Sequence, residues 1–405
     1  MSQSEAILRI AAKGDGVTAS GRHVPGGVPG DMLLADGSLE PGPQHVAPPC
    51  RHFALRPAQG CGGCQLQHCD EAALADFITA RVVNAAQGQG LEPVQVAPAH
   101  LSPPGSRRRA SLHAMRVGGA IVLGFREGGS HRVVDLAQCP VLEPRLFALV
   151  APLRRMLARQ NGRIAADIDL TLAEQGVDLG LKGIAVEGLA ATEAMLDFAR
   201  NNGLARLTLD QGYGPEPLWE PEPVTVALSG VSVPLPPGAF LQATEDGEAA
   251  LVVAARAWLA GSAAIADLFS GLGAFAFALA GNGAKLLAAE AARDAHLACK
   301  AAAGRAQLPV HALHRDLFRN PLQPDELNRF DAVLLDPPRA GAKEQVRQLA
   351  ASTVGRVVYV SCNPSSWARD AATLVAGGYR LAELRPVGQF RWSTHVELAS
   401  LFVRG

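Results

Sequence analysis

Residues 267–280 read DLFSGLGAFAFALA, and this stretch decides the fold of the C-terminal part of the chain. Asp267 ends a short apolar run, Gly271 and Gly273 follow, and an apolar segment typical of a helix comes next. This order predicts a strand, a tight turn and a helix, in which glycine lets the backbone approach a ligand closely. The next apolar run ends at Glu290, a carboxylate suited to two ribose hydroxyls. By itself the glycine pattern fits a methyl-donor site, an NAD site or an ordinary turn.

The sequence around this stretch alternates between helix-like and strand-like segments. Helices are predicted at 245–260, 291–306 and 343–352, and strands at 263–269, 285–290, 309–316, 331–336, 356–361 and 396–403. Such alternation predicts a doubly wound parallel sheet.

Acidic residues end successive strands of this predicted sheet. Asp267, Asp316 and Asp336 come at three strand ends, where side chains line one crevice. A crevice of this kind suits S-adenosylmethionine, whose amino acid, ribose and adenine parts spread across it. Asp336 precedes Pro-Pro, which makes a rigid extended loop. The next residue is Arg339, where methyltransferases that act on exocyclic amino groups usually carry an aromatic residue. We therefore expect Asp336 to hydrogen-bond a planar polar ring.

A cysteine follows the last of the parallel strands. In YVSCNPSSWARD, residues 359–370, Cys362 comes directly before Asn-Pro. An inert core cysteine is one interpretation, because free cysteine is often buried. The alternative is a nucleophile: C5 of uracil reacts poorly until a thiolate adds to C6, after which C5 can take a methyl group. A base must then remove the C5 proton, and Glu397 at the start of the final strand is the candidate. The neighbouring motifs favour the nucleophile.

Three cysteines near the N-terminus form a group typical of a metal site. Cys50, Cys61 and Cys64 have the spacing C-x10-C-x2-C, and Cys69 is the next cysteine along the chain. Structural disulfides are not expected in a reducing compartment. An iron–sulfur cluster prefers thiolates, whereas zinc would also recruit histidine. The thiolate set favours a cluster, and a fourth ligand must come from elsewhere.

Bulk composition indicates an ordinary globular protein with several cores. The chain has 405 residues, 48% of them hydrophobic, and a net charge of -1. The start of the sequence has no pattern of a signal peptide, and no stretch is typical of a membrane span, so we expect a cytoplasmic protein that does not contact a membrane. Residues 107–116, with Arg126, His131 and Arg132, form a basic strip that predicts phosphate contact.

An ordered set of motifs resembles a known family. The motifs are CGGCQLQH, QCPVL, GAFLQAT, DLFSGLGAF, LLDPPRAG and VSCNPSSWARD, in this order. Together they are similar to the iron–sulfur RNA uracil-5 methyltransferases, which make 5-methyluridine in ribosomal or transfer RNA. The resemblance implies Cys362 as nucleophile and Glu397 as base. It implies that Gln242, Glu290 and Asp336 contact the cofactor or the target base. It also implies Cys139 as the fourth ligand of a [4Fe–4S] cluster.

The residues and the resemblance together predict three domains. These are a small, shortened TRAM-like β domain over 1–47, a central α+β domain with the cysteines over 48–240, and an S-adenosylmethionine-dependent methyltransferase domain over 241–405. We expect a monomer that methylates uracil C5 in RNA, with 23S ribosomal RNA preferred. Transfer RNA is one alternative, and a catalytically silent iron–sulfur RNA-binding protein is another. Methylation of cytosine C5 or of an amino group is disfavoured.

Overall fold

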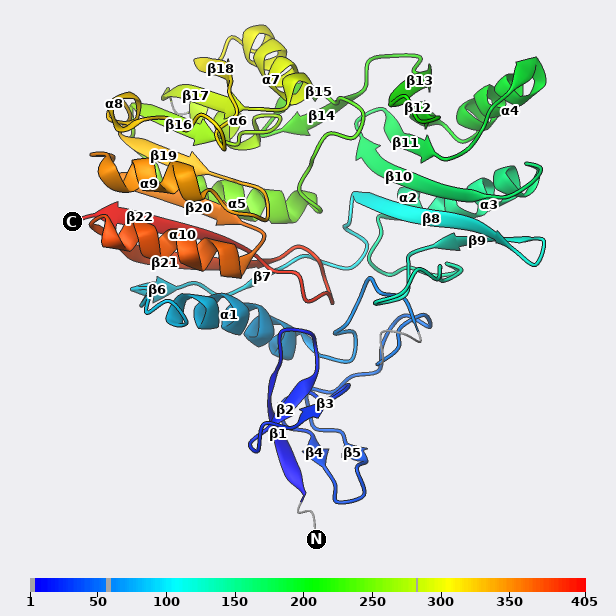
Figure 1. Ribbon diagram of the computed structural model, residues 1–405, viewed down its shortest axis with the longest axis horizontal. Coiled ribbons are helices and arrows are strands. Elements are labelled where there is room, and N and C mark those ends of the chain that lie inside the picture. The colour runs from blue at the N-terminus through cyan, green and yellow to red at the C-terminus, as the bar shows by residue number, and fades with distance from the viewer. Residues whose placement is uncertain (1–3, 56–59, 282) are drawn as a thin grey trace. The chain divides into compact units, whose positions relative to one another are not determined.

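The structure is a computed structural model that describes residues 4–55, 60–281 and 283–405. The chain divides into two compact units (Figure 1). The first contains residues 1–77, 102–224 and 390–394, and the second contains residues 78–101, 225–389 and 395–405. The chain passes from one unit to the other within helix α1 (Glu71–Gln87).

A nine-stranded sheet forms the centre of the second unit. Its order is β18-β17-β16-β19-β20-β22-β21-β6, and β7 pairs with β21. Five strands are parallel: β16 (Ala264–Leu268), β17 (Lys285–Glu290), β18 (Val310–His314), β19 (Ala332–Leu335) and β20 (Arg356–Ser361). Strand β22 (Glu397–Arg404) is antiparallel to β20 and to β21 (Tyr379–Gly388). The short strands β6 (Gln95–Val96) and β7 (His100–Leu101) are parallel to β21. The predicted parallel sheet is present, with a mixed edge.

Helices alternate with the parallel strands, as the sequence predicts: the first precedes β16 and the others follow β16 to β20 in turn. They are α5 (Glu245–Trp258), α6 (Ala274–Ala280), α7 (Arg293–Arg305), α8 (Pro324–Leu327), α9 (Lys343–Ala351) and α10 (Pro364–Ala376). In the view of Figure 1, α9 and α10 lie in front of the sheet. All four residues of β19 are buried, as expected for a strand covered on both faces. The hairpin of β14 (Thr225–Leu228) and β15 (Val231–Pro234) completes this unit.

The first unit holds two antiparallel-rich sheets. Five short strands have the order β3-β2-β1-β4-β5: β1 (Glu5–Ile10), β2 (Gly16–Thr18), β3 (His23–Val24), β4 (Met32–Leu33) and β5 (Leu39–Glu40). Six longer strands have the order β13-β12-β11-β10-β8-β9: β8 (Arg109–Val117), β9 (Ala120–Gly124), β10 (Ala165–Ala173), β11 (Gly176–Lys182), β12 (Leu204–Asp210) and β13 (Pro215–Trp219). Helices α2 (Pro144–Ala148), α3 (Val150–Ala158) and α4 (Gly188–Asn201) accompany them. Buried and exposed residues alternate along most of β10, as expected for a sheet with one covered face.

The α/β character of the C-terminal part is therefore confirmed. The TRAM-like character of the N-terminal sheet and the three-domain division stay predictions. None of the helices in the described part of the chain combines the length and hydropathy needed to cross a membrane.

Candidate active site

One pocket of about 670 Å³ lies at the carboxyl ends of the parallel strands. This is the edge at which open α/β sheets bind ligands. Its lining includes six residues predicted from the sequence, namely Gln242, Gly271, Glu290, Asp336, Cys362 and Glu397. The structure thus brings together residues that are up to 155 positions apart in the chain.

The glycine-rich turn and Glu290 are tied to each other. The backbone N–H of Gly271 donates to one Glu290 carboxylate oxygen at 2.9 Å, and that of Ala292 donates to the other at 2.6 Å. These bonds hold the carboxylate at the wall of the pocket. Gly271 and Phe269 both have a positive φ, of 53° and 63°. Positive φ in a non-glycine residue such as Phe269 is uncommon and costs backbone energy, which marks a turn held by its surroundings.

Three residues predicted to bind the cofactor do not line this pocket. Gly273 precedes α6 with φ of 96°, and a Cβ there would lie 2.8 Å from the Cys299 sulfur, so its glycine is required by packing. Asp316 lies beyond the end of β18, where its carboxylate accepts from the backbone N–H groups of Phe318 and Arg319. Asp267 is fully buried behind the turn.

The buried Asp267 carboxylate has an unusual environment. Neither oxygen makes a hydrogen bond of ordinary geometry within the described residues. Burial, with the nearby carboxyls of Asp336 and Glu290, holds the pKa of Asp267 well above its usual range, and the Ala276 N–H only partly opposes this rise. A buried carboxyl outside the pocket lining fits a structural role better than a ligand contact.

Cys362 lies between the end of β20 and the start of α10. Asn363 is the N-cap of this helix: its side chain accepts from the Ser365 N–H at 3.1 Å, and Pro364 occupies the first turn. The thiol therefore stands next to a helix N-terminus, which favours negative charge. Burial and the carboxyls of Glu397 and Asp336 nevertheless raise the pKa of the Cys362 thiol to about 11, and Arg339 opposes this rise.

Glu397 reaches the same pocket because β22 runs against the parallel strands. The first residue of an antiparallel strand lies at the edge where its parallel neighbours end. Ser361 of β20 pairs with Leu398 of β22, which places Cys362 and Glu397 next to this pair. Glu397 is only 4% exposed.

Asp336 lies at the end of a chain of side-chain hydrogen bonds. The Gln242 Nε2 donates to its Oδ2 at 3.3 Å. Gln389, in turn, donates from Nε2 to the Gln242 Oε1 at 2.7 Å. Burial raises the pKa of Asp336 to about 7, with the Gln242 hydrogen bond lowering it and the Glu248 charge raising it further. Asp336 can therefore titrate near neutral pH.

Sequence reasoning missed several residues at this site. Phe240 lines the pocket and is 59% exposed, which is unusual for a phenylalanine. Phe269 and Phe318 also line it, with ring centres 5.3 Å apart. Their positions beside GAFLQAT, DLFSGLG and HRDLF were a usable signal. No local sequence signal pointed to Gln389, because its partner Gln242 lies 147 residues away.

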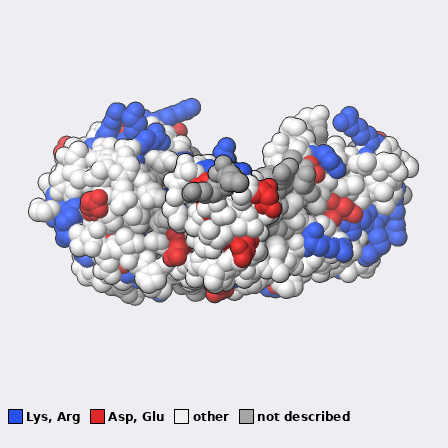
Figure 2. Space-filling model, turned by 90° about the horizontal axis from the view of Figure 1, so that it is seen from below, with Lys and Arg blue, Asp and Glu red and all other residues white. Residues whose placement is uncertain are grey.

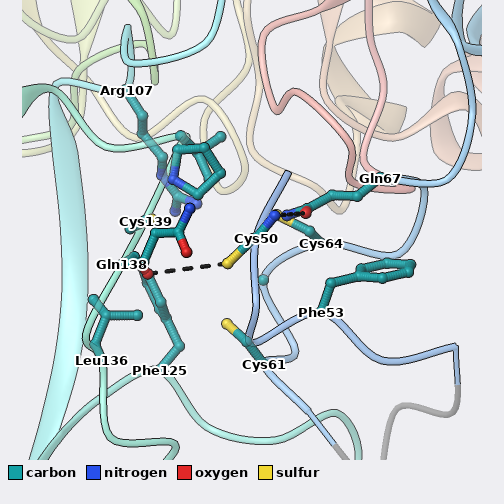
Figure 3. A pocket seen from close by; sticks show the side chains of 13 residues that line it. Cys50, Phe53, Cys61, Cys64, Gln67, Arg107, Phe125, Leu136, Gln138 and Cys139 are labelled. Atoms are coloured by element: carbon teal, nitrogen blue, oxygen red, sulfur yellow. Dashed lines mark hydrogen bonds between the residues drawn. The ribbon is translucent and has the colours of Figure 1, made fainter. Parts of the chain in front are cut away.

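A second pocket, in the first unit, is lined by four cysteines (Figure 3). Cys50, Cys61, Cys64 and Cys139 face this small cavity of about 20 Å³. The backbone N–H of Cys50 donates to Gln67 Oε1 at 3.1 Å. Cys69 is buried but does not line the cavity, although it is nearer in sequence than Cys139.

The chemistry of this cavity fits an iron–sulfur cluster better than zinc. Its lining contains no histidine among the described residues, and its walls are largely apolar. Burial raises the pKa of Cys64 to about 12, so thiolates there need a cationic partner. Within the described ranges no three His, Cys, Asp or Glu side chains converge as ligands of a single ion would.

The predicted basic strip is not one exposed surface. Arg108 is buried, and Arg107 lines the cysteine cavity with its guanidinium carbon 5.4 Å from the Phe390 ring centre. These two arginines are therefore not part of an exposed basic surface. On the face shown in Figure 2, Lys and Arg gather in separate groups with acidic residues between them.

Comparison with known proteins places these features in a family. The profile of the tRNA (uracil-5-)-methyltransferase family matches residues 312–404. An uncharacterized RNA methyltransferase of Zymomonas mobilis is 49% identical over 98% of this chain and 99% of its own length. The 23S rRNA (uracil(1939)-C(5))-methyltransferase RlmD of Pectobacterium atrosepticum is 33% identical over 90% of this chain and 82% of its own. The chain belongs to the RNA uracil-5 methyltransferase family.

A solved structure extends this result to the fold. The Pyrococcus abyssi tRNA (uracil-54, C5)-methyltransferase, in complex with S-adenosyl-L-homocysteine, superposes with a TM-score of 0.73 at 23% identity, over 99% of this chain and 100% of that one. As a member of the RNA uracil-5 methyltransferase family, the protein is an S-adenosylmethionine-dependent enzyme with RNA as substrate. The alternative of a catalytically silent binding protein was therefore wrong.

Proposed function

We propose that this methyltransferase modifies uridine C5 in 23S ribosomal RNA, with Cys362 as the nucleophile and Glu397 as the base. One observation carries the proposal: both side chains line the pocket that also holds Gly271 and Glu290 of the cofactor turn. A thiol and a carboxylate beside a methyl donor are the two groups that this chemistry requires.

The Cys362 thiolate begins the reaction. Its sulfur forms a bond to C6 of uracil, and the electron pair of the C5–C6 double bond moves onto C5 and O4. S-adenosylmethionine supplies the methyl group, which C5 takes while the methyl–sulfonium bond breaks. Because the pKa of the thiol is raised to about 11 in the free protein, the thiol must first lose its proton to solvent to form the thiolate. Arg339 and the α10 N-terminus are the groups that favour it.

Glu397 completes the reaction. Its carboxylate removes the C5 proton, the C5–C6 double bond forms again, and the Cys362 thiolate leaves C6. Burial keeps water away from the Glu397 carboxylate, so that water does not compete with the C5 proton for this carboxylate.

Three further residues are suited to hold the target base. The exposed Phe240 ring offers a stacking surface for a base that has left its helix. Asp336 and Gln242, which line the same pocket, offer an acceptor and a donor. Glu290 is suited to the ribose of the cofactor.

Cys50, Cys61, Cys64 and Cys139 would hold a [4Fe–4S] cluster. Such a cluster would supply four metal–thiolate bonds that join chain segments otherwise far apart in sequence, and so stabilise this part of the first unit. A structural role is favoured, since the proposed methyl transfer needs no electron.

Ribosomal RNA is the first candidate substrate because the RlmD relative, named for 23S rRNA, covers 90% of this chain. Transfer RNA is the second candidate, because the family profile and the Pyrococcus abyssi structure carry tRNA names. The test is incubation of the protein and S-adenosylmethionine with unmodified 23S RNA and, separately, with unmodified tRNA. Nucleoside mass spectrometry should find 5-methyluridine in the 23S RNA. Its appearance in tRNA alone would reverse the choice.

A further inference from the structure

The Gln242 amide is held by a second amide that does not reach the pocket. Gln389 follows β21, is 2% exposed and is not part of the pocket lining. Its Oε1 accepts from the Ala243 backbone N–H at 2.8 Å, and its Nε2 donates to the Gln242 Oε1 at 2.7 Å.

The backbone donor fixes the orientation of both amides. The oxygen and nitrogen of an amide are alike in shape, so their assignment rests on their partners. A backbone N–H can only donate, so the Gln389 oxygen must face Ala243 and its nitrogen must face Gln242. The Gln242 oxygen is thereby taken, and its nitrogen faces Asp336. A flip of either amide would bring two like groups together.

The Gln389 side chain packs closely against the first turn of α5. Gly247, in the first turn of α5, has no Cβ, and a Cβ there would lie 2.8 Å from the Gln389 Cβ and 3.3 Å from its Oε1. The N-cap residue Thr244 accepts from the Gly247 N–H and fixes this turn. The hydrogen bonds that run from the Ala243 N–H through Gln389 and Gln242 to Asp336 form a relay. This relay is therefore anchored at the N-terminus of α5.

We propose that Gln389 is a positioning residue that makes the enzyme select uracil over cytosine. It holds the Gln242 amide as a donor beside the Asp336 acceptor. Uracil presents an N3–H donor next to carbonyl acceptors and so complements this pair. Cytosine presents an acceptor at N3 and an amino donor at C4, so both of its groups oppose the pair. The inference rests on the proposed function, in which Asp336 and Gln242 contact the base.

The same relay favours the ionised form of Asp336. The hydrogen bond from Gln242 lowers the pKa of Asp336, against burial and the charge of Glu248 on α5. The other titratable groups that interact with Asp336 are Asp267 at the end of β16, Tyr359 on β20 and Cys362 after it. Gln389 is linked to Asp336 by hydrogen bonds through the Gln242 amide, so its removal should act on Asp336 through Gln242.

The test replaces Gln389 by Met, which keeps its length and removes both hydrogen bonds. We expect an acid limb of kcat/KM that moves to higher pH. We also expect the ratio of Kd values for RNA with cytidine or uridine at the target position to fall about tenfold, the worth of one hydrogen bond. Gln345→Met is the matched control, because Gln345 is equally buried and its amide bonds only the Leu322 backbone. This control should lose stability but keep both the pH profile and the Kd ratio.

A second variant, Gln389→Glu, keeps the acceptor for Ala243 and, when ionised, cannot donate to Gln242. It should reproduce both effects even if Gln389→Met folds poorly. If either folded variant keeps the wild-type pH profile and Kd ratio, the proposal is wrong. The variant Asp336→Asn distinguishes a failure of the Gln389 proposal from a failure of the proposed function. If Asp336→Asn also leaves both quantities unchanged, then Asp336 does not read the base.

Discussion

Cys362 and Glu397 are held at one edge of the sheet by an antiparallel pairing. The residue before the cysteine pairs with the residue after the glutamate, as Ser361 and Leu398 are partners in the ladder of β20 and β22. A strand parallel to β20 would begin at the opposite edge and would carry Glu397 away from the pocket. The reversal of direction between β20 and β22 is thus what allows one pocket to hold both a nucleophile and a base.

Replacing Glu397 by Gln should stop the reaction after methyl transfer. An amide cannot remove the C5 proton, so the Cys362–C6 bond would not break. We expect a covalent RNA–protein complex that survives denaturing electrophoresis, with turnover reduced by about 10²- to 10⁴-fold, the usual contribution of a general base. Cys362→Ala in the same background should abolish the complex. Normal turnover by Glu397→Gln would assign the base elsewhere.

The pH profile should report Asp336. An acid group whose pKa is about 7 is ionised above that pH and protonated below it. If the ionised form accepts from uracil N3–H, kcat/KM should fall as the pH drops below about 7. Asp336→Asn does not titrate, so its kcat/KM should be lower and should lack this limb. An unchanged limb in the variant would show that another group titrates.

Phe240→Ala should weaken RNA binding at the target base. Base–aromatic stacking contributes about 1–3 kcal/mol, so KM for RNA is expected to rise roughly 5- to 100-fold. Phe240→Tyr keeps the ring and should remain near the wild type. Steady-state kinetics with one RNA checks both variants, and equal KM values for the three proteins would exclude stacking on this ring.

The lining of the cysteine cavity predicts different outcomes for two cysteine variants. Anaerobically purified Cys139→Ala should lose iron and visible absorbance, because Cys139 faces the other three thiols. Cys69→Ala should keep both, since Cys69 is buried outside the cavity. Iron and sulfide analysis measures the difference. Loss of iron from Cys69→Ala alone would reverse the ligand assignment.

Asp267→Asn should stabilise the protein without bound cofactor. The pKa of the Asp267 carboxyl is raised in the fold, so the folded state binds more protons than the unfolded state and stability falls as the pH rises above about 4. The variant lacks this penalty. The Tm difference, variant minus wild type, should therefore grow with pH from acid to neutral. Equal Tm values for the variant and the wild type at every pH would mean that other groups in the fold offset the cost of the buried Asp267 charge.

Local sequence signals were enough to predict the parallel part of the second sheet. Strand β17 and helix α7 lie where apolar periodicity predicts them, because their patterns arise within one segment. Strand β21 was not predicted, although its ten residues adjoin β22. It carries three charged residues, of which Arg380 is exposed and Glu383 and Arg385 are partly buried, so its apolar pattern is weak.

The site residues also divide into those that local sequence patterns predict correctly and those that they do not. Cys362 and Glu397 lie at strand ends and were placed by the order of elements. Asp267 and Asp316 were predicted to line the crevice by the same rule but do not, because the depth of a side chain below a strand end depends on packing. The relay through Gln389 depends on contacts over 146 and 147 residues, which no local pattern contains.

The identity of the nucleophile can be measured most directly with RNA that contains 5-fluorouridine. Fluorine at C5 cannot be removed as a proton is, so the enzyme should remain bonded to C6 after methyl transfer. Protease digestion and mass spectrometry of the complex should find one methylated nucleotide on the peptide that contains Cys362, and only when S-adenosylmethionine is present. A nucleotide on another cysteine, or no adduct from an enzyme that methylates ordinary RNA, would contradict the central claim.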